Sequence, residues 1–350
     1  MSLEIYPKDF STRYGLYTAT AISMSANYND VGKIQIVEPL DDYAIASMKE
    51  GNIVYDTEHE TSYIIVNVKC DTPNRLITAN GYTAEWLLNQ RCITLGTAVV
   101  NIEEGVYKLV SSNLRGLGRV KIAPLKGLQE LFRKNTMEDE DADIVECGQL
   151  LDQITEVLDY GKLGRRMVWD SDNLEWTFEI YKGTDRTSGI HAVAFVEEHG
   201  TCSDLVVNVD ESTYKNVAYI QYKYKDDIEV TSVGDVEGDE RRELWVGTSV
   251  VAEKGESAKD VKRRAETTAA LELGKYLKRT SFTVTIDAQD LGKKYNLGDT
   301  VACVSNRFDM AFQAQVTGWK YTLDSNGETT SIVLGEPTLT AIDEVILSGH

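Results

Sequence analysis

The sequence lacks the features expected of a membrane protein, a secreted protein or a protein with long linkers. No apolar run in its 350 residues approaches the roughly 18 residues that a membrane-spanning helix needs. Residues 1–15 contain no basic stretch followed by an apolar one, so we expect no signal peptide and no membrane insertion. Only five prolines and no Ser/Gly tract argue against long linkers. A chain of this length suits about two to four domains.

Positive charge is also scarce. The chain has 36 Lys and Arg against 56 Asp and Glu, a net charge of −20. Affinity for nucleic acids comes mainly from Lys and Arg side chains that neutralise phosphates. The balance therefore argues against specific nucleic-acid binding, but it is compatible with a surface that DNA must pass without sticking.

Cysteine and histidine are few and scattered, which argues against a metal centre. No Cys-x-x-Cys pair occurs, and we interpret the cysteines as buried small hydrophobic residues in a reducing compartment. His199 stands beside Glu197 and Glu198, but the spacing matches no standard zinc pattern. We expect His59, His191 and His199 to be exposed residues near strand ends. The five cysteines are Cys70, Cys92, Cys147, Cys202 and Cys303.

Several short segments look like fragments of known sites but lack their partners. "DSDN" (170–173) and "DSNGE" (324–328) resemble parts of a calcium loop, yet strands flank both, so we expect hairpin turns. "NLRGLGRV" (113–120) lacks the full glycine spacing of a nucleotide site. We interpret the acidic run 137–143 as the start of a helix rather than a cation site. We therefore expect no catalytic, cofactor or metal site, and no enzyme.

The pattern of apolar residues changes along the chain. Up to residue 83, short β-branched and aromatic runs punctuated by Gly, Asn, Asp or Pro predict a small antiparallel sheet or barrel, closed by a helix at 83–92. Helices are predicted at 123–135 and 144–161, followed by a hairpin that turns at 171–173. Later strands are interrupted by one strong amphipathic helix at 256–279. Its N-cap is Ser257, with Asp260 three residues on.

Two distant segments repeat one pattern. "EGNIVYD" (50–56) and "LGDTVAC" (297–303) each place Gly, then Asn or Asp, before a strand with Val at the same offset. The pairs are Gly51-Asn52 and Gly298-Asp299. Since no catalytic neighbour accompanies Gly298-Asp299, we interpret both pairs as turns that begin a strand. One β-barrel module used twice would explain the repetition.

Three short motifs in order carry a family resemblance. The motifs are Tyr-x-Gly-x-Asp-Arg (Tyr181, Gly183, Asp185, Arg186), Tyr-Lys-Asn-Val-Ala (Tyr214, Lys215, Asn216, Val217, Ala218) and Leu-Gly-Asp-x-Val (Leu297, Gly298, Asp299, Val301). They resemble elements of the hub proteins of long-tailed phage baseplates and tail tips, in the siphovirus branch shared with prophages and phage-derived contractile particles. The N-terminal residues 3–95 also resemble a module of that family.

The resemblance implies a β-rich α+β fold. It implies two related small β-barrels, similar to those of tail tubes, with a mixed α/β domain between them and a helix-containing insertion in the second barrel. The expected boundaries are 1–104 for the first barrel, 105–204 for the α/β domain, 205–235 and 288–337 for the second barrel, 236–287 for the insertion and 338–350 for a C-terminal tail.

The resemblance also implies a structural role in assembly of the virion or of a phage-like particle, made in the host cytoplasm. Three chains would form a pseudo-sixfold ring that adapts the sixfold tail tube to a central spike or tip. The implied partners are other copies of this chain, the tail tube or distal tail protein, the spike or tip protein and the tape measure protein. The alternatives are another baseplate or distal-tail component, or a cell-wall-active tail enzyme. A negatively charged channel wall would then explain the acidic composition.

Overall fold

A computed structural model describes residues 3–132, 143–196, 201, 203–277, 279–286, 290–305 and 310–335. These residues form two compact units. One contains residues up to 132, 143–206 and 282–335, and the other contains residues 207–281. The second unit begins earlier than the expected insertion at 236. None of the helices in the described part of the chain is long and apolar enough to cross a membrane.

The first unit is built around a 13-stranded sheet. In β3 and β4 buried residues alternate with partly exposed ones, because successive side chains of a strand point to opposite faces. The strands are β1 (Leu3–Tyr6), β2 (Tyr14–Gly15), β3 (Ala21–Asn27), β4 (Lys33–Pro39), β5 (Ile53–Asp56), β6 (Thr61–Asp71), β7 (Leu76–Thr83), β15 (Ala194–Val196), β16 (Ser203–Asp210), β20 (Arg279–Ile286), β21 (Thr300–Ser305), β22 (Met310–Asp324) and β23 (Gly327–Gly335).

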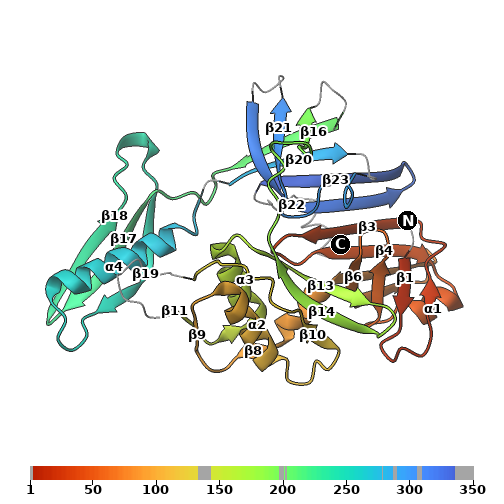
Figure 1. Cartoon of the computed structure of the whole chain (residues 1–350), viewed down its shortest axis with the longest axis horizontal. Helices are drawn as coiled ribbons and strands as arrows, with labels where there is room; N and C mark the ends of the chain where they lie inside the picture. Colours follow the sequence, from red (N-terminus) through yellow and green to blue (C-terminus); the bar gives the residue numbers. More distant parts are fainter. Residues whose placement is uncertain are drawn as a thin grey trace. The chain divides into compact units, whose positions relative to one another are not determined.

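The sheet has an N-terminal and a C-terminal half (Figure 1). The N-terminal half has the order β3-β4-β7-β6-β5-β1-β2, and the C-terminal half has the order β16-β20-β23-β22-β21-β15. The halves join where β22 pairs antiparallel with β3, from Gly318 opposite Asn27 to Leu323 opposite Ile22. One continuous sheet therefore contains strands from both ends of the chain.

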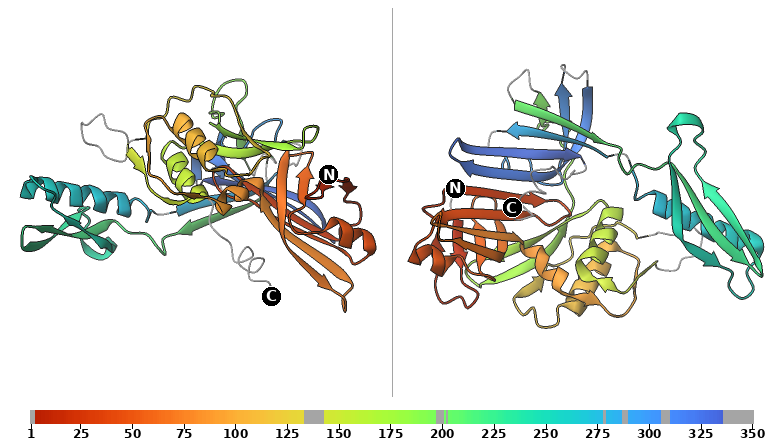
Figure 2. Two further views of the ribbon diagram at one scale, coloured as in Figure 1. Left: turned by 90° about the horizontal axis from the view of Figure 1, so that it is seen from below. Right: turned by 180° about the vertical axis from the view of Figure 1, so that it is seen from behind.

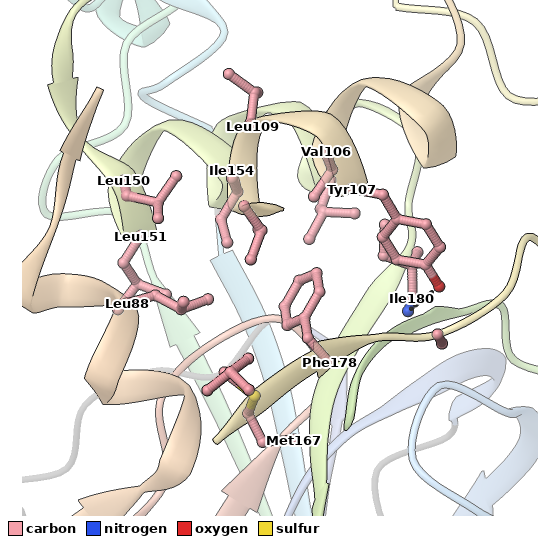
Figure 3. Packing of buried hydrophobic residues seen from close by; sticks show 14 of the residues in the cluster. Leu88, Val106, Tyr107, Leu109, Leu150, Leu151, Ile154, Met167, Phe178 and Ile180 are labelled. Atoms are coloured by element: carbon pink, nitrogen blue, oxygen red, sulfur yellow. Dashed lines mark hydrogen bonds between the residues drawn. The ribbon is translucent and has the colours of Figure 1, made fainter. Parts of the chain in front are cut away.

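A mixed α/β region lies between the two halves in the sequence, and its core also includes Tyr6, Ile53 and Ile64 of the N-terminal half. Figure 3 shows Val106, Ile154, Met167 and Phe178 packed together in this core. The expected hairpin is confirmed, since β13 and β14 pair antiparallel around residues 171–174. The elements of this region are η1 (Ala84–Gln90), β8 (Cys92–Ile93), β9 (Thr97–Val99), α2 (Ile102–Asn113), β10 (Val120–Ile122), β11 (Asp143–Val145), β12 (Gly148–Gln149), α3 (Leu150–Tyr160), β13 (Gly164–Asp170) and β14 (Glu175–Tyr181); a short helix, α1 (Asp42–Ser47), follows β4.

The helix expected at 123–135 is wrong for residues 123–132, and the rest of that range lies outside the described residues. This segment is instead held in an irregular conformation by the first turn of α2. The Glu103 carboxylate accepts the N–H groups of Lys126 at 2.5 Å and Leu128 at 2.8 Å. These hydrogen bonds connect the segment to α2. A local helical pattern in the sequence cannot indicate such a contact with another element.

Other helix boundaries also differ from the sequence prediction. The helix expected at 83–92 is a 3-10 helix over Ala84–Gln90, and α3 begins at Leu150 because the residues before it form β11 and β12. Helix α2 (Ile102–Asn113) was not predicted from the sequence. Its signals were an N-cap, Asn101, and acidic residues in the first turn, Glu103 and Glu104.

The second unit packs one helix on a three-stranded sheet. The strand order is β18 (Asp227–Val233), β17 (Val217–Tyr224) and β19 (Glu243–Val251), with a 3-10 turn, η3 (Gly238–Glu240), before β19. Helix α4 (Ala258–Leu273) places Val261, Ala265 and Ala269 in the core. The expected N-cap is confirmed, since Ser257 and Asp260 form a capping box at the start of α4.

The cysteines are less buried than expected. Cys303 is buried, but Cys70, Cys92 and Cys147 are exposed free thiols, so that interpretation is wrong for these three. Cys70 lies near the end of β6, where both it and its neighbour Lys69 are exposed. Cys92 lies on β8 beside the buried Ile93, so its side chain points to the opposite face. Cys202 lies outside the described residues.

Candidate functional site

Two of the motif segments meet at the start of β21. The buried carboxylate of Asp299 accepts the N–H groups of Thr184 at 2.8 Å and Asn296 at 3.0 Å, and it forms an ion pair with the guanidinium group of Arg186. Asp299 is 3% exposed. A buried carboxylate needs such donors, because burial without them would cost several kcal/mol. The Arg186 and Asp299 motif residues thus form one interaction.

Two glycines allow these segments to approach each other. Gly298 has φ +87°, and a Cβ atom there would lie 2.2 Å from the ring of Tyr28. A Cβ atom on Gly183 would lie 1.8 Å from the carbonyl oxygen of Gly298. Both distances are shorter than real carbon contacts, so each position requires glycine.

Tyr28, in the turn after β3, completes the contact. Its hydroxyl accepts the N–H of Gly183 at 3.2 Å and lies 3.2 Å from the carbonyl oxygens of Lys162 and Tyr181. Its ring packs edge-on against the ring of Tyr181, with centroids 5.1 Å apart. Burial raises the pKa values of both tyrosines above their ordinary value. No pattern in the sequence singled out Tyr28, because a tyrosine in an Asn-rich turn has no recognisable spacing.

The corner at Gly51 has the same hydrogen bonds as the corner at Gly298. The Gly51 N–H donates to the Ile65 carbonyl at 2.7 Å, as the Gly298 N–H does to Val316 at 2.7 Å. The Ile65 N–H donates to the Asn52 carbonyl at 2.9 Å, and the Val316 N–H to Asp299 at 2.8 Å.

The side chains at the two corners also correspond. The Asn52 side-chain oxygen accepts the N–H of Lys8 at 3.1 Å, whereas Asp299 accepts the N–H of Thr184 at 2.8 Å. Asn52, like Asp299, is 3% exposed. The two turns that the sequence paired therefore share their backbone contacts and the position of one side-chain acceptor.

The remaining motif residues have separate places. Asp185 is exposed and accepts the N–H of Thr187 at 2.9 Å, which closes a local turn. Val301 is fully buried in β21.

The Tyr214–Val217 motif lies in the second unit, where it leads into β17. The Lys215 N–H donates to the Tyr276 carbonyl at 2.9 Å. The Asn216 side chain accepts the N–H of Arg242 at 2.7 Å and donates to the Glu240 carbonyl at 2.8 Å. This motif holds the ends of neighbouring segments together and takes no part in the Gly298 corner.

The expectation that His59 is exposed is wrong. Its ring nitrogen Nδ1 lies 2.6 Å from the carboxylate of Asp56, and its side chain is only 6% exposed. The ring stacks on Trp319 of β22, with centroids 4.6 Å apart. Because Trp319 comes from the other half of the sheet, the local polar sequence gave no sign of this burial. His191 is exposed as expected, and His199 lies outside the described residues.

Metal-binding side chains do not gather in the described residues. No group of three or more His, Cys, Asp or Glu there could hold a metal ion. A groove of about 570 Å³ lies beside the Gly51 corner in the first unit, between Ile64, Trp86, Leu117 and Trp176. Its lining contains no histidine, cysteine or serine.

Comparison with solved structures identifies the fold. The tail protein from Neisseria meningitidis MC58 is 11% identical, with a TM-score of 0.59 over 98% of each chain. The prophage MuSo2 43 kDa tail protein from Shewanella oneidensis is 13% identical, with a TM-score of 0.57 over 96% of this chain and 99% of that one. Prophage tail protein gp18 from Listeria monocytogenes EGD-e is 13% identical, with a TM-score of 0.51 over 99% and 98%. These likenesses show a shared β-rich tail-protein fold.

Comparison with protein families identifies the relationship by sequence. No curated protein matches the chain. Residues 134–336, more than half of the chain, match the model of the Siphovirus ReqiPepy6 Gp37-like protein family. This match confirms the resemblance to siphovirus tail proteins, and the chain belongs to the Siphovirus ReqiPepy6 Gp37-like protein family.

Proposed function

We propose that this protein is the structural hub of a phage-type tail or baseplate. Three copies form a pseudo-sixfold ring that connects the hexameric tail tube to a central spike or tip. The observation that carries the proposal is the correspondence of the two halves of the sheet. Six strands of each half follow one another in the same order: β3, β4, β7, β6, β5 and β1 in the N-terminal half correspond to β16, β20, β23, β22, β21 and β15 in the C-terminal half. The seventh strand of the N-terminal half, β2, pairs with β1 and has no counterpart among the described strands.

Two details support this correspondence. The corners at Gly51 and Gly298 share their hydrogen bonds. β5 and β21 begin at these corners, and the next strand of each half has a bulge at the corresponding place. The bulge lies between Ile65 and Asn67 in β6 and between Val316 and Gly318 in β22. One difference is that β1 runs antiparallel to β5 whereas β15 runs parallel to β21. Two equivalent β-barrels in each chain would let three chains present six similar surfaces to a sixfold tube.

The motif residues act as architecture in this proposal. Arg186, Gly183 and Tyr181 attach the segment before the second barrel to its corner at Gly298-Asp299. We propose residues 1–104 as the first barrel and the following α/β region as the connection between the barrels. The partners are other copies of the chain, the tail tube or distal tail protein, the spike or tip protein and the tape measure protein.

Two alternatives remain within tail biology. Another baseplate or distal-tail component would share the fold but would usually form a hexamer. A cell-wall-active enzyme would need an acid–base or metal site, and zymography on cell walls would reveal its activity. Family membership favours a structural role over catalysis.

The stoichiometry of the chain in intact tails tests the proposal. We expect three copies per particle, counted by quantitative mass spectrometry against the tail tube protein, which forms sixfold rings. Cryo-electron microscopy of the same particles should show threefold symmetry at this level. Six copies in a sixfold ring would overturn the hub assignment and favour a distal-tail component.

A further inference from the structure

The equivalent strands β22 and β6 differ in how one of their edges is used. One edge of β22 pairs first with β21, up to Gln315 opposite Thr300. Beyond the bulge the same edge pairs with β3, from Gly318 to Leu323, while β23 occupies the other edge. In β6, residues up to Ile64 pair with β5 in the same manner, and β7 occupies the other edge.

Beyond its bulge, β6 has no counterpart of β3. Residues Asn67–Asp71 pair with β7, and no other strand in the described part of the chain pairs with them. The side chains of Asn67, Lys69 and Cys70 are exposed. Figure 2 shows the β6–β7 hairpin extending beyond the neighbouring strands. A strand edge of this length leaves backbone N–H and C=O groups that a further strand can pair with.

The missing counterpart of β3 is present elsewhere in the chain. Strand β16 holds the place in the C-terminal half that β3 holds in the N-terminal half. β3 lies between β4 and β22, whereas β16 pairs with β20 and ends the sheet among the described strands. Val206 of β16 is 58% exposed. Among the described strands, each chain thus has one open edge on β6 and one on β16. These edges correspond to the edges of β22 and β3, which pair with each other within the chain.

We propose that β16 of one copy pairs antiparallel with the Asn67–Asp71 edge of β6 in a neighbouring copy. The pairing reproduces between chains the contact that β3 makes with β22 inside the chain. It rests on the proposed ring and identifies the surfaces that join its subunits. Because two different edges meet, the contact is heterologous, and it closes into a ring when the rotation between copies is one third of a turn.

Disulfide trapping with the native Cys70 tests this pairing. Directly opposed residues of neighbouring strands have Cα atoms about 4.5–5.5 Å apart, within the range for a disulfide. In full-length protein that retains Cys70 and Cys303 and carries C92S, C147S and C202S, we would introduce S203C, V206C or D210C, one at a time. These positions sample both faces of β16. We expect at least one variant to form an intermolecular disulfide with Cys70, in products that end at three chains. The matched control adds C70S to each variant.

Amide hydrogen exchange supplies a second measurement on the cysteine-containing native sequence. We expect amides within 67–71 to become protected as the concentration is raised and the chain assembles. The equivalent residues 318–323 should be protected at every concentration, because β3 already covers them.

The outcomes separate the edge pairing from the ring. A trimer with no Cys70 link above the C70S control and no new protection at 67–71 overturns the pairing and leaves the hub function standing. Cys70 links in products that end at six chains overturn the ring of three and support the pairing. A chain that neither assembles nor cross-links contradicts both.

Discussion

Gly51 and Gly298 adopt nearly the same left-handed conformation, with φ +85° and +87°, but they have different neighbours. A Cβ atom on Gly51 would approach only the flexible side chain of Lys8, at 3.1 Å. A Cβ atom on Gly298 would overlap the buried ring of Tyr28, at 2.2 Å. Both corners therefore require a left-handed backbone, but a Cβ atom has less room at Gly298 than at Gly51.

We expect G298A to destabilise the protein more than G51A. Both substitutions place alanine in the left-handed region, which costs about 1–2 kcal/mol. G298A also forces the Tyr28 ring to move, which adds about 1–3 kcal/mol for overpacking. Urea unfolding of the two variants measures the difference. Equal losses of unfolding free energy would show that Tyr28 moves without cost.

His59 is buried between a carboxylate and an indole ring. Asp56 is fully buried, so its hydrogen bond to the His59 ring satisfies an oxygen that water does not reach. The stacking on Trp319 also connects the turn between β5 and β6 to β22 of the other half.

We expect H59A to lower the free energy of unfolding by about 1–3 kcal/mol, because it leaves the Asp56 carboxylate without this partner. The fluorescence of Trp319 should also change when the stacked ring is removed. H191A is the matched control, because His191 is exposed, and it should leave the urea midpoint unchanged. Equal stability of H59A and H191A would contradict a structural role for His59.

At the scale of elements, α4 begins with a capping box. The Ser257 hydroxyl oxygen accepts the N–H of Asp260 at 3.3 Å, and the Asp260 carboxylate accepts the N–H of Ser257 at 3.3 Å. Two N–H groups that the helix itself cannot satisfy are paired in this way.

We expect S257A to reduce the local stability of α4 by about 1 kcal/mol. The amides of the first turn, 258–261, should then exchange faster in hydrogen–deuterium exchange. S257T retains the hydroxyl and is the conservative control. Unchanged exchange in S257A would show that packing of Val261 and Ala265 alone holds this end of the helix.

The same capping box predicts a dependence on pH. The hydrogen bonds from Ser257 lower the pKa of the Asp260 carboxyl below its usual range. A carboxyl whose pKa is lower in the folded state contributes stability above its unfolded pKa of about 3.9, and this contribution is lost as the pH falls through the folded value. Exchange of the first-turn amides, corrected for the intrinsic pH effect, should therefore increase below about pH 4 in wild type. D260N should not show this additional increase.

Two segments show which local sequence signals predict secondary structure correctly. The 164–181 hairpin was predicted because turn residues separate two strand-like runs, and the Asp170 carboxylate accepts the N–H groups of Asp172 at 2.9 Å and Asn173 at 3.0 Å. The helix expected at 123–135 failed because Glu103 of α2 supplies hydrogen bonds from outside the segment. Sequence signals within one turn or hairpin predicted the secondary structure correctly. Contacts with another element could not be predicted from such signals.

At the scale of the whole molecule, the acidic charge is unevenly distributed. Residues 207–281 contain 15 Asp and Glu and 13 Lys and Arg, which is a net −2 of the total −20. The remaining −18 belongs to the rest of the chain, which includes both halves of the large sheet.

We expect the channel of the assembled ring to be negatively charged, so that it repels DNA and lowers friction as the contents pass. A cryo-electron microscopy structure of the ring, with charges assigned to the residues that line the channel, provides the measurement. A neutral or basic lining would contradict this role for the acidic composition.

The local features of this protein could be predicted from its amino-acid sequence alone. The sequence contained the repeated Gly51 and Gly298 turns, the Ser257 cap, the 164–181 hairpin and the resemblance to siphovirus tail proteins. These features were readable because turns, caps and periodicity depend on residues close together in the chain.

The contacts between residues far apart in the sequence are seen only in the tertiary structure. The contact of Arg186 with Asp299, the place of Tyr28 against Gly298, the burial of His59 under Trp319 and the open edge of β6 all depend on which strands pair. Strand pairing joins residues far apart in sequence, and its register is set by the packing of whole faces and not by any local pattern. These contacts therefore required the folded chain.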